Sequence, residues 1–344
     1  VENLNQLVMI LATNMKPPEI KIIPQETEDY KYDFKNIKGQ IQARKASEIA
    51  AAGMHNMLMM GSPGVGKSII AKTMPSILPD MTLEEQIEIS KIQSVAGNLS
   101  GSLVKTRPVR SPHHTATVSA MIGGGFNPKP GEITQAHGGI LFLDELPEFS
   151  RQVIETLRQP LEDEKIIVSR SGGTYEFPAK FILIGAMNPC KCGYYPDMNK
   201  CTCTEQEVKK YMEKISGPLI DRIDLCVHMN QVTYFQLEKE EQPEDSLTIK
   251  ERVNRAVQIQ RERYANEKFK FNSQLSGENI KKYCKLNQEE QHLMEKIYTT
   301  MDLSIRAYDK IIKVARTIAD LKQHEKIQQG DIAEAVRYRP VLFK

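Results

Sequence analysis

An apolar run leads directly into a glycine-rich loop in residues 56–68, Asn56-Met57-Leu58-Met59-Met60-Gly61-Ser62-Pro63-Gly64-Val65-Gly66-Lys67-Ser68. The run has the length of a buried strand, and Gly61–Ser68 match the pattern G-x-x-x-x-G-K-[ST] in full. Glycines allow such a loop to wrap closely around phosphates, with its backbone N–H groups turned inward. The segment from Lys67 to Met74 is expected to begin a helix, which Pro75 ends or kinks. The pattern predicts an ATP site, because a chance glycine loop would lack the flanking strand and helix.

A second apolar run supplies acidic residues that suit the same site. Lys67 is expected to reach the β- and γ-phosphates, and the Ser68 hydroxyl to ligate Mg²⁺. Residues 140–143 are apolar and end at Asp144 and Glu145. Asp144 can hold the Mg²⁺ shell, and Glu145 is placed to polarise an attacking water. An acid after an apolar run is weak evidence alone, but it becomes strong when it is paired with the glycine loop.

Three apolar runs predict the central strands of a parallel sheet. Residues 56–60, 140–143 and 181–184 are each continuous, of strand length and followed by polar residues. This favours an α/β fold with helices on both faces of the sheet. Asn188 follows the third run and could orient the attacking water, although a turn-forming Asn before Pro189 is the alternative. The last hundred residues carry no strand pattern and are expected to be helical, with apolar residues at helical spacing (Ile311, Ile312, Ala315, Ile318 and Ala319).

Composition excludes few functions. Hydrophobic residues make up 40% of the 344 residues and charged residues 26%, and the formal net charge is +2. Bulk charge therefore argues neither for nor against nucleic acid, and any basic surface must be local. No run approaches about 18 uninterrupted apolar residues, so no membrane partner is expected. The chain starts at Val1 without a signal-peptide pattern, and we expect it to begin partway through a longer, cytoplasmic protein.

Four of the six cysteines form a compact C-x-C-x₈-C-x-C pattern. Four thiolates at this spacing can enclose one tetrahedral Zn²⁺, and turn-forming residues between the pairs would bring them together. Such a closed site is structural rather than catalytic. An iron–sulfur cluster is the rival, although its usual spacings differ, and four free thiols are the other alternative. The predicted zinc ligands are Cys190, Cys192, Cys201 and Cys203.

With these motifs, the chain resembles AAA+ ATPases, and among them the magnesium-chelatase-like proteins of the ComM/YifB type. The resemblance runs from Phe34 to the C-terminus. It rests on the motifs above and on six further segments, Phe34–Gln40, Arg110–Thr115, Gly123–Glu132, Leu141–Phe149, Ser216–Asp224 and Leu303–Tyr308. It implies an AAA+ core with a parallel sheet, two β-hairpin inserts and a C-terminal all-α lid. The expected parts are 1–32 as the remnant of an upstream domain with a linker, 33–235 as the ATPase domain, 236–247 as a linker and 248–344 as the lid.

The resemblance also implies roles for two arginines. Arg222 corresponds to the arginine finger, which is offered to the ATP of a neighbouring subunit, and Arg306 to the sensor arginine of the lid. A guanidinium can neutralise charge on the γ-phosphate as it breaks away. The alternative for Arg222 is a surface ion pair with Asp221 or Asp224. Because a finger acts only between subunits, a homo-oligomer, most simply a hexameric ring, is implied; whether Arg306 acts within its own subunit stays open.

Two inserts are expected to carry the contacts with DNA. Glycine and proline clusters near residues 110–135 suggest the helix-2 insert of this clade, and residues 164–180 suggest a pre-sensor hairpin around Ser171-Gly172-Gly173. Lys129 and Arg170 could contact phosphates from these inserts. A solvated surface charge is a nearly equal alternative for Arg170. His113 and His114 have no assigned role.

The resemblance favours an ATP-driven motor on single-stranded and branched DNA, a helicase that promotes branch migration in natural transformation. One rival is a magnesium-chelatase motor subunit, which the cysteine pattern and residues 110–115 fit less well. Another is a protein-remodelling ATPase, for which no convincing aromatic pore-loop pair is present in the sequence. The predicted cofactors are ATP, Mg²⁺ and Zn²⁺.

Overall fold

A computed structural model describes residues 4–13, 30–99, 103–125, 128–170, 173–233 and 243–339. The chain divides into two units, residues 1–31 and 32–344, and each is described by itself. In the first unit, helix α1 spans Leu4–Thr13. The second unit contains the other helices and strands of the described residues. Within the described residues, no helix is both long and apolar enough to cross a membrane.

Five parallel strands form the central sheet of the second unit, in the order β2-β5-β8-β1-β9. The strand β1 pairs with β8 on one side and with β9 on the other, so the strand before the glycine loop is central. The strands are β1 (Met57–Gly61), β2 (Val109–Arg110), β5 (Ile140–Leu143), β8 (Ile182–Met187) and β9 (Leu225–Met229). The predicted α/β fold with a parallel sheet is confirmed.

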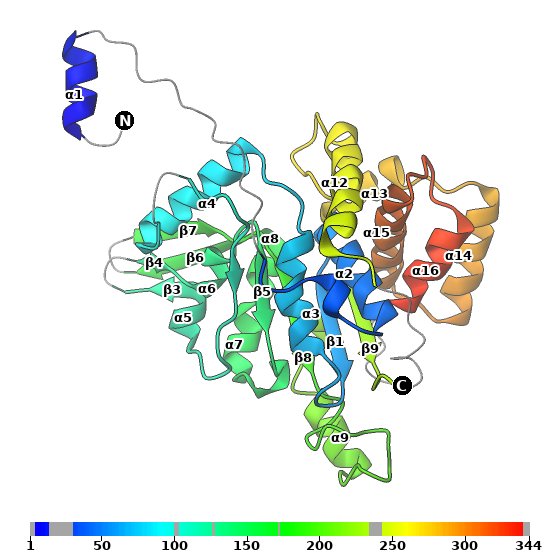
Figure 1. Cartoon of the computed structure of the whole chain (residues 1–344). Coiled ribbons are helices and arrows are strands. Elements are labelled where there is room, and N and C mark those ends of the chain that lie inside the picture. Colours follow the sequence, from blue (N-terminus) through cyan, green and yellow to red (C-terminus); the bar gives the residue numbers. More distant parts are fainter. Residues whose placement is uncertain are drawn as a thin grey trace. The chain divides into compact units, whose positions relative to one another are not determined.

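Helices cover both faces of this sheet, as Figure 1 shows. Alternate residues of β1 enter different cores: Met57 and Met59 join the core that includes α2, α3 and the C-terminal helices, whereas Leu58 and Met60 face the other. Such burial on both faces explains why the strand is continuously apolar. The helices and 3₁₀ turns here are η1 (Phe34–Asn36), α2 (Ile41–Gly53), α3 (Lys67–Thr73), η2 (Met74–Ile77), α4 (Leu83–Ala96), α5 (Val118–Ile122), α6 (Glu132–Gln135), η3 (Leu146–Glu148), α7 (Arg151–Thr156), α8 (Arg158–Asp163), α9 (Glu205–Met212) and α10 (Gly217–Ile220).

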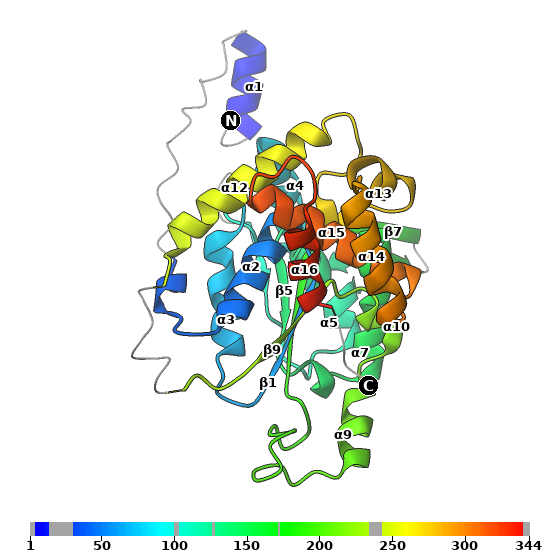
Figure 2. The same cartoon turned by 90° about the vertical axis from the view of Figure 1, so that its right-hand side faces the viewer.

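The C-terminal part is helical, as predicted, and packs against α2 through α12 and α15 (Figure 2). Its elements are α12 (Ser246–Arg263), η4 (Asn272–Gln274), α13 (Glu278–Tyr283), α14 (Gln288–Thr300), α15 (Ile305–Leu321) and α16 (Gln329–Arg337). The expected linker at 236–247 is only partly described, because residues 234–242 lie outside the described residues and α12 begins at Ser246. The domain boundaries stay a prediction.

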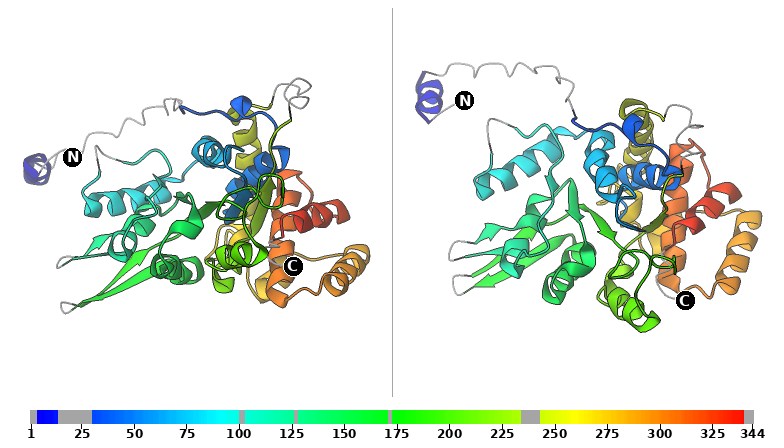
Figure 3. Two further views of the ribbon diagram at one scale, coloured as in Figure 1. Left: turned by 90° about the horizontal axis from the view of Figure 1, so that it is seen from below. Right: turned by 60° about the horizontal axis from the view of Figure 1, so that its bottom comes forward.

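Two antiparallel hairpins stand apart from the central sheet. The strands β3 (Gly123–Gly124) and β4 (Lys129–Pro130) form one, and β6 (Lys165–Arg170) and β7 (Gly173–Pro178) form the other. They extend from the same side of the second unit in both views of Figure 3. The predicted turn residues Ser171 and Gly172, and Phe126 and Asn127 of the other insert, lie outside the described residues. The antiparallel pairing of β3 with β4 and of β6 with β7 confirms that both inserts are hairpins.

A buried polar network joins the sheet to the C-terminal helices. His55, which precedes β1, is fully buried, with Nδ1 3.2 Å from Oδ2 of Asp224 and Nε2 2.7 Å from Oγ1 of Thr317 on α15. Burial raises the pKa of Asp224, but the charge of Lys313 and the hydrogen bond with His55 lower it more, to about 2. The ionised carboxylate therefore stabilises the packing of α15 against the sheet edge.

We expect Asp224→Asn to lower the free energy of unfolding by about 2 kcal/mol at pH 7, since one unit of pKa depression corresponds to about 1.4 kcal/mol. Because folding lowers the pKa of Asp224, its carboxylate stabilises the fold at pH values above its pKa in the unfolded chain, which is about 4. This stabilisation is lost as the pH falls from about 4 to about 2. Chemical denaturation at pH 7 and pH 3 should show a smaller difference between variant and wild type at pH 3. The exposed Asp163→Asn should change stability by less than about 0.5 kcal/mol. An equal difference at both pH values would contradict the role of the Asp224 charge.

Candidate active site

The glycine loop lies at the carboxyl end of β1, between that strand and α3. Gly64 and Gly66 have φ values of +80° and +99°, in the left-handed region that glycine adopts without strain. Nothing lies within 4 Å of a Cβ built on Gly64. A backbone of this kind turns its N–H groups toward one point and leaves room for phosphates. The loop geometry fits the predicted ATP site.

Lys67 is turned back into this loop. Its Nζ donates to the carbonyl oxygens of Gly61 (2.6 Å) and Ser62 (3.0 Å) and to Oδ1 of Asn188 (3.0 Å). Only 9% of the residue is exposed. Burial lowers the pKa of Lys67, whereas the nearby carboxylates of Asp144 and Glu145 raise it. The Lys67 ammonium thus donates its hydrogen bonds to uncharged oxygens. The oxygens of a bound triphosphate would take their place and form stronger, charge-assisted hydrogen bonds.

Ser68 and Asp144 meet in the same place from different elements. The Ser68 hydroxyl, on the first turn of α3, donates to Oδ2 of Asp144 at 2.8 Å. Asp144 directly follows β5, and its other oxygen accepts the backbone N–H of Glu145 at 3.0 Å. A hydroxyl and a carboxylate are oxygen ligands of the kind that Mg²⁺ prefers. The two residues therefore fit the predicted Mg²⁺ site, where the ion would offset phosphate charge.

The structure places His114 beside Glu145, which the sequence did not indicate. Glu145 is 59% exposed and has a φ of +51°, so its side chain reaches solvent at the sheet edge. His114 Nδ1 lies 3.7 Å from its Oε2, and the imidazole packs edge-on against Phe149. The His113 ring lies 4.1 Å from that of His114 and bonds Thr115 Oγ1 at 2.9 Å. A histidine that interacts with the candidate water-activating carboxylate is suited to orienting it.

Arg222 lies at the opposite edge of the sheet from the glycine loop. Its backbone carbonyl accepts the Asn56 side chain at 2.9 Å, and Asn56 directly precedes β1. β1 alone separates that point from the loop by about 13 Å, at about 3.3 Å per residue. The guanidinium donates to the Pro218 carbonyl at 3.0 Å and pairs with Glu162 on α8. The carboxylate partner of Arg222 is thus Glu162 rather than Asp221 or Asp224.

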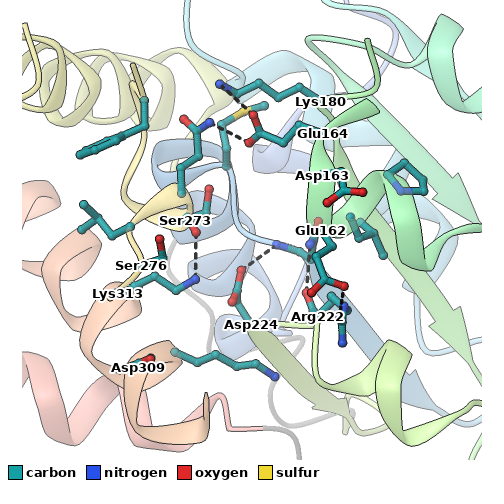
Figure 4. A pocket seen from close by; sticks show the side chains of 18 of the residues that line it. Glu162, Asp163, Glu164, Lys180, Arg222, Asp224, Ser273, Ser276, Asp309 and Lys313 are labelled. Carbon is teal, nitrogen blue, oxygen red and sulfur yellow. Dashed lines mark hydrogen bonds and ion pairs between the residues drawn. The ribbon is translucent and has the colours of Figure 1, made fainter. Parts of the chain in front are cut away.

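Arg306 lies on the same side as Arg222. It is 68% exposed at the start of α15, with Nη1 3.3 Å from Oδ2 of Asp221. Both arginines line a cavity of about 570 Å³ whose walls come from α8, the segment before β9, η4 and α15. Figure 4 shows Arg222 next to Glu162 on one side of this cavity and Lys313 bonded to Ser273 on the other. The two arginines form one group, and Lys67, Ser68, Asp144 and Asn188 form another.

The four predicted zinc ligands converge between β8 and α9. Their sulfur atoms all lie within 4.8 Å of one another. Three of the separations are 3.3, 3.5 and 3.8 Å. Tetrahedral thiolates about 2.3 Å from one zinc ion would be about 3.8 Å apart. No disulfide links these residues, which are free thiols. The donor set fits one zinc ion, whereas an iron–sulfur cluster places several atoms between its thiolates and needs a wider opening. Cys226 and Cys284 are buried elsewhere.

The predicted DNA contacts lie on the hairpins. Lys129 is exposed in β4, and Arg170 ends β6, although its side chain lies outside the described residues. Their contact with DNA stays a prediction.

The parallel sheet and the glycine loop define the class as a P-loop ATPase of the AAA+ type. The family description "Magnesium chelatase, subunit ChlI" matches residues 33–237, and "Magnesium chelatase, subunit ChlI C-terminal" matches residues 243–339. The chain belongs to the magnesium chelatase subunit ChlI family. The AAA+ ATPase domain of this family implies hydrolysis of ATP with Mg²⁺, and the four-cysteine group suggests zinc.

Several known proteins are similar to this chain. Competence protein ComM of Haemophilus influenzae is 42% identical over 90% of this chain and 60% of its own length. The uncharacterized protein YifB of Escherichia coli is 41% identical over 90% and 61%. The probable DNA helicase MCM9 of Arabidopsis thaliana is 25% identical over 67% of this chain and 29% of its own length. The chain spans about 60% of the length of the first two relatives.

We expect Lys67→Ala to abolish ATP hydrolysis, because the variant loses the ammonium that the loop directs at the phosphates. Glu145→Gln should still bind ATP but turn over about 10²- to 10⁴-fold more slowly, the contribution typical of a positioned general base. Single-turnover hydrolysis and binding of a fluorescent ATP analogue separate the two effects. Normal hydrolysis by Lys67→Ala would refute the assignment of this site.

Proposed function

We propose that this chain is the motor part of a ring-shaped ATPase that moves on single-stranded and branched DNA and promotes branch migration during natural transformation. The observation that carries the proposal is the position of Arg222 at the sheet edge opposite the glycine loop. An arginine there can assist hydrolysis only in a neighbouring subunit. A closed ring of identical subunits, most simply a hexamer, satisfies this for every site.

Within one subunit, we assign nucleotide binding and water activation to the group around the glycine loop. Lys67 binds the β- and γ-phosphates, and Ser68 and Asp144 hold Mg²⁺. Glu145 takes the proton of the attacking water. Asn188, now bonded to Lys67, orients that water as the γ-phosphate leaves.

We assign Arg222 and Arg306 to the ATP of the adjacent subunit. Both line one cavity, whose lining includes no residue of the phosphate loop. Their present partners are carboxylates, and phosphate oxygens offer the same kind of bidentate acceptor. An arginine finger contributes about 10³–10⁵ to the rate in related systems. This arrangement supports action in trans for both arginines.

We assign DNA binding to the two hairpins. They project on the same side of the ATPase core, and Lys129 is exposed on one of them. In a ring, one positive charge per subunit would give a circle of contacts with DNA phosphates. Such contacts bind the DNA backbone rather than the bases. The names of two similar proteins, a competence protein and a probable DNA helicase, agree with such a role. The free thiols of the described residues support a cytoplasmic location.

A magnesium-chelatase motor is the second candidate, because both family descriptions that match the chain refer to that enzyme. Such a subunit would use the same nucleotide chemistry to drive a partner that inserts Mg²⁺ into a porphyrin. DNA should not stimulate its hydrolysis.

Mixing two inactive variants tests the assignment of Arg222. Arg222→Ala should lower hydrolysis about 10³- to 10⁵-fold, and Lys67→Ala should be inactive. In mixed rings, an intact phosphate loop of the first variant can meet an intact arginine of the second, so ATPase activity should return. The surface variant Arg158→Ala, on the adjacent helix, is the control and should hydrolyse ATP alone. No recovery on mixing, with mixed rings demonstrated by particle imaging, would argue against the trans assignment.

DNA dependence separates the candidate functions. We expect single-stranded and forked DNA to stimulate hydrolysis, whereas unfolded protein should not. The double variant Lys129→Ala/Arg170→Ala should bind DNA more weakly, and the slope of log affinity against log salt should become shallower, because fewer phosphate contacts release fewer counterions. ATP-analogue affinity measured on the same variant shows whether its nucleotide site is intact. Stimulation by unfolded protein but not DNA would favour protein remodelling, and stimulation by neither would favour the chelatase motor.

A further inference from the structure

The four-cysteine loop, residues Cys190–Cys203, lies directly against the phosphate-binding loop. Gly193 has a φ of +91°, and a Cβ at that position would meet Cδ of Pro63 at 2.6 Å. Pro63 is the third residue of the glycine-rich pattern. In Figure 1, the segment before α9 lies just beyond the ends of β1 and β8, as this contact requires. The two loops therefore cannot move independently at the Gly193–Pro63 contact.

A second connection runs through Asn188. Its side chain accepts from Lys67 at 3.0 Å, and only Pro189 separates it from the fully buried Cys190. On the far side of the loop, α9 carries Tyr211. Burial raises the pKa of the Tyr211 hydroxyl, and a backbone hydrogen bond from Asn188 opposes that rise. Asn188 therefore contacts Lys67 of the phosphate-binding loop and lies near Tyr211, beyond the other end of the four-cysteine loop.

Little besides the sulfur cluster holds this loop in shape. Residues 188–204, all of them described, form turns and bends without helix or strand. Their backbone hydrogen bonds close short turns, such as Gly193 N to Cys190 O at 3.0 Å and Cys201 N to Asp197 O at 2.7 Å. The associated apolar cluster is small and consists of cysteines with Val208 and Tyr194. In such loops a structural zinc ion contributes much of the folding free energy.

We propose that zinc bound by the four-cysteine loop braces the phosphate-binding loop through the Gly193–Pro63 contact, so that zinc and ATP strengthen each other's binding. Zinc fixes where Gly193 and Asn188 lie, and these in turn limit the positions open to Pro63 and Lys67. The inference goes beyond the motor function and needs only nucleotide binding. It holds whether or not the protein acts on DNA.

Coupling of this kind is reciprocal. We expect metal-stripped protein to bind a fluorescent ATP analogue about 5- to 150-fold more weakly than the zinc-loaded protein, the usual range for coupled sites. Zinc affinity, measured by competition with a chromophoric chelator, should rise by the same factor when the analogue saturates the protein. Elemental analysis should find one zinc and no iron per chain. Absence of zinc, or nucleotide affinity unchanged by its removal, would overturn the proposal.

The variant Pro63→Ala separates the direct contact from a general effect on folding. It removes the side chain that Gly193 touches but leaves the four thiols and the G-K-S residues in place. It should retain zinc, while zinc removal should change its nucleotide affinity less than about twofold, within the scatter expected for uncoupled sites. Cys284→Ser, which removes a buried thiol of the helical part, should keep the full wild-type coupling. If Pro63→Ala shows the wild-type factor, the coupling acts through global stability and the proposed route is wrong.

Discussion

The direction of the strands in one parallel sheet is the constraint that organises this molecule. Every strand of the central sheet ends at the same edge, so the residues that follow β1, β5 and β8 gather around one point. Lys67, Asp144 and Asn188 meet there although they are far apart in sequence. The residues that precede β1 and β9 gather at the other edge for the same reason, and Arg222 is among them. The described residues of one chain thus form two groups at opposite edges of the sheet.

The helical part is attached at the second of these edges. His55 links the entrance of β1 to Asp224 before β9 and to Thr317 on α15. This brings the start of α15, with Arg306, next to α10 and Arg222. The buried network is fully bonded, as a buried carboxylate must be if it is to favour folding. The position of Arg306 is therefore a consequence of how the helices dock on the sheet.

The sequence could predict the parts that depend on local pattern. The glycine loop, the continuous apolar strands, the hairpin inserts and the helical C-terminal part all follow from the periodicity and composition of short segments, and the C-x-C pairs predicted a compact thiol cluster. Contacts between distant segments could not be predicted this way. Nothing near His114 indicates that it lies beside Glu145, and Glu162 is 60 residues from Arg222. The Gly193–Pro63 contact likewise depends on β1 and β8 being neighbours.

The carboxylates that pair with Arg222 and Arg306 suggest how ATP hydrolysis in the proposed ring could depend on the assembly of subunits without a large conformational change. In the single chain, Arg222 pairs with Glu162, which is 61% exposed, and Arg306 with Asp221, which is 47% exposed. The Arg306–Asp221 pair is exposed on both sides and contributes at most about 1 kcal/mol, so exchanging it for a neighbour's phosphate costs little. The Arg222 side chain is only 15% exposed, so solvent screens its pair with Glu162 less. In the proposed ring the triphosphate brings several negative charges into a confined interface, where the attraction is stronger than at a solvated surface. In the proposed ring, the two guanidinium groups would exchange these carboxylates for the nucleotide that a neighbouring subunit presents.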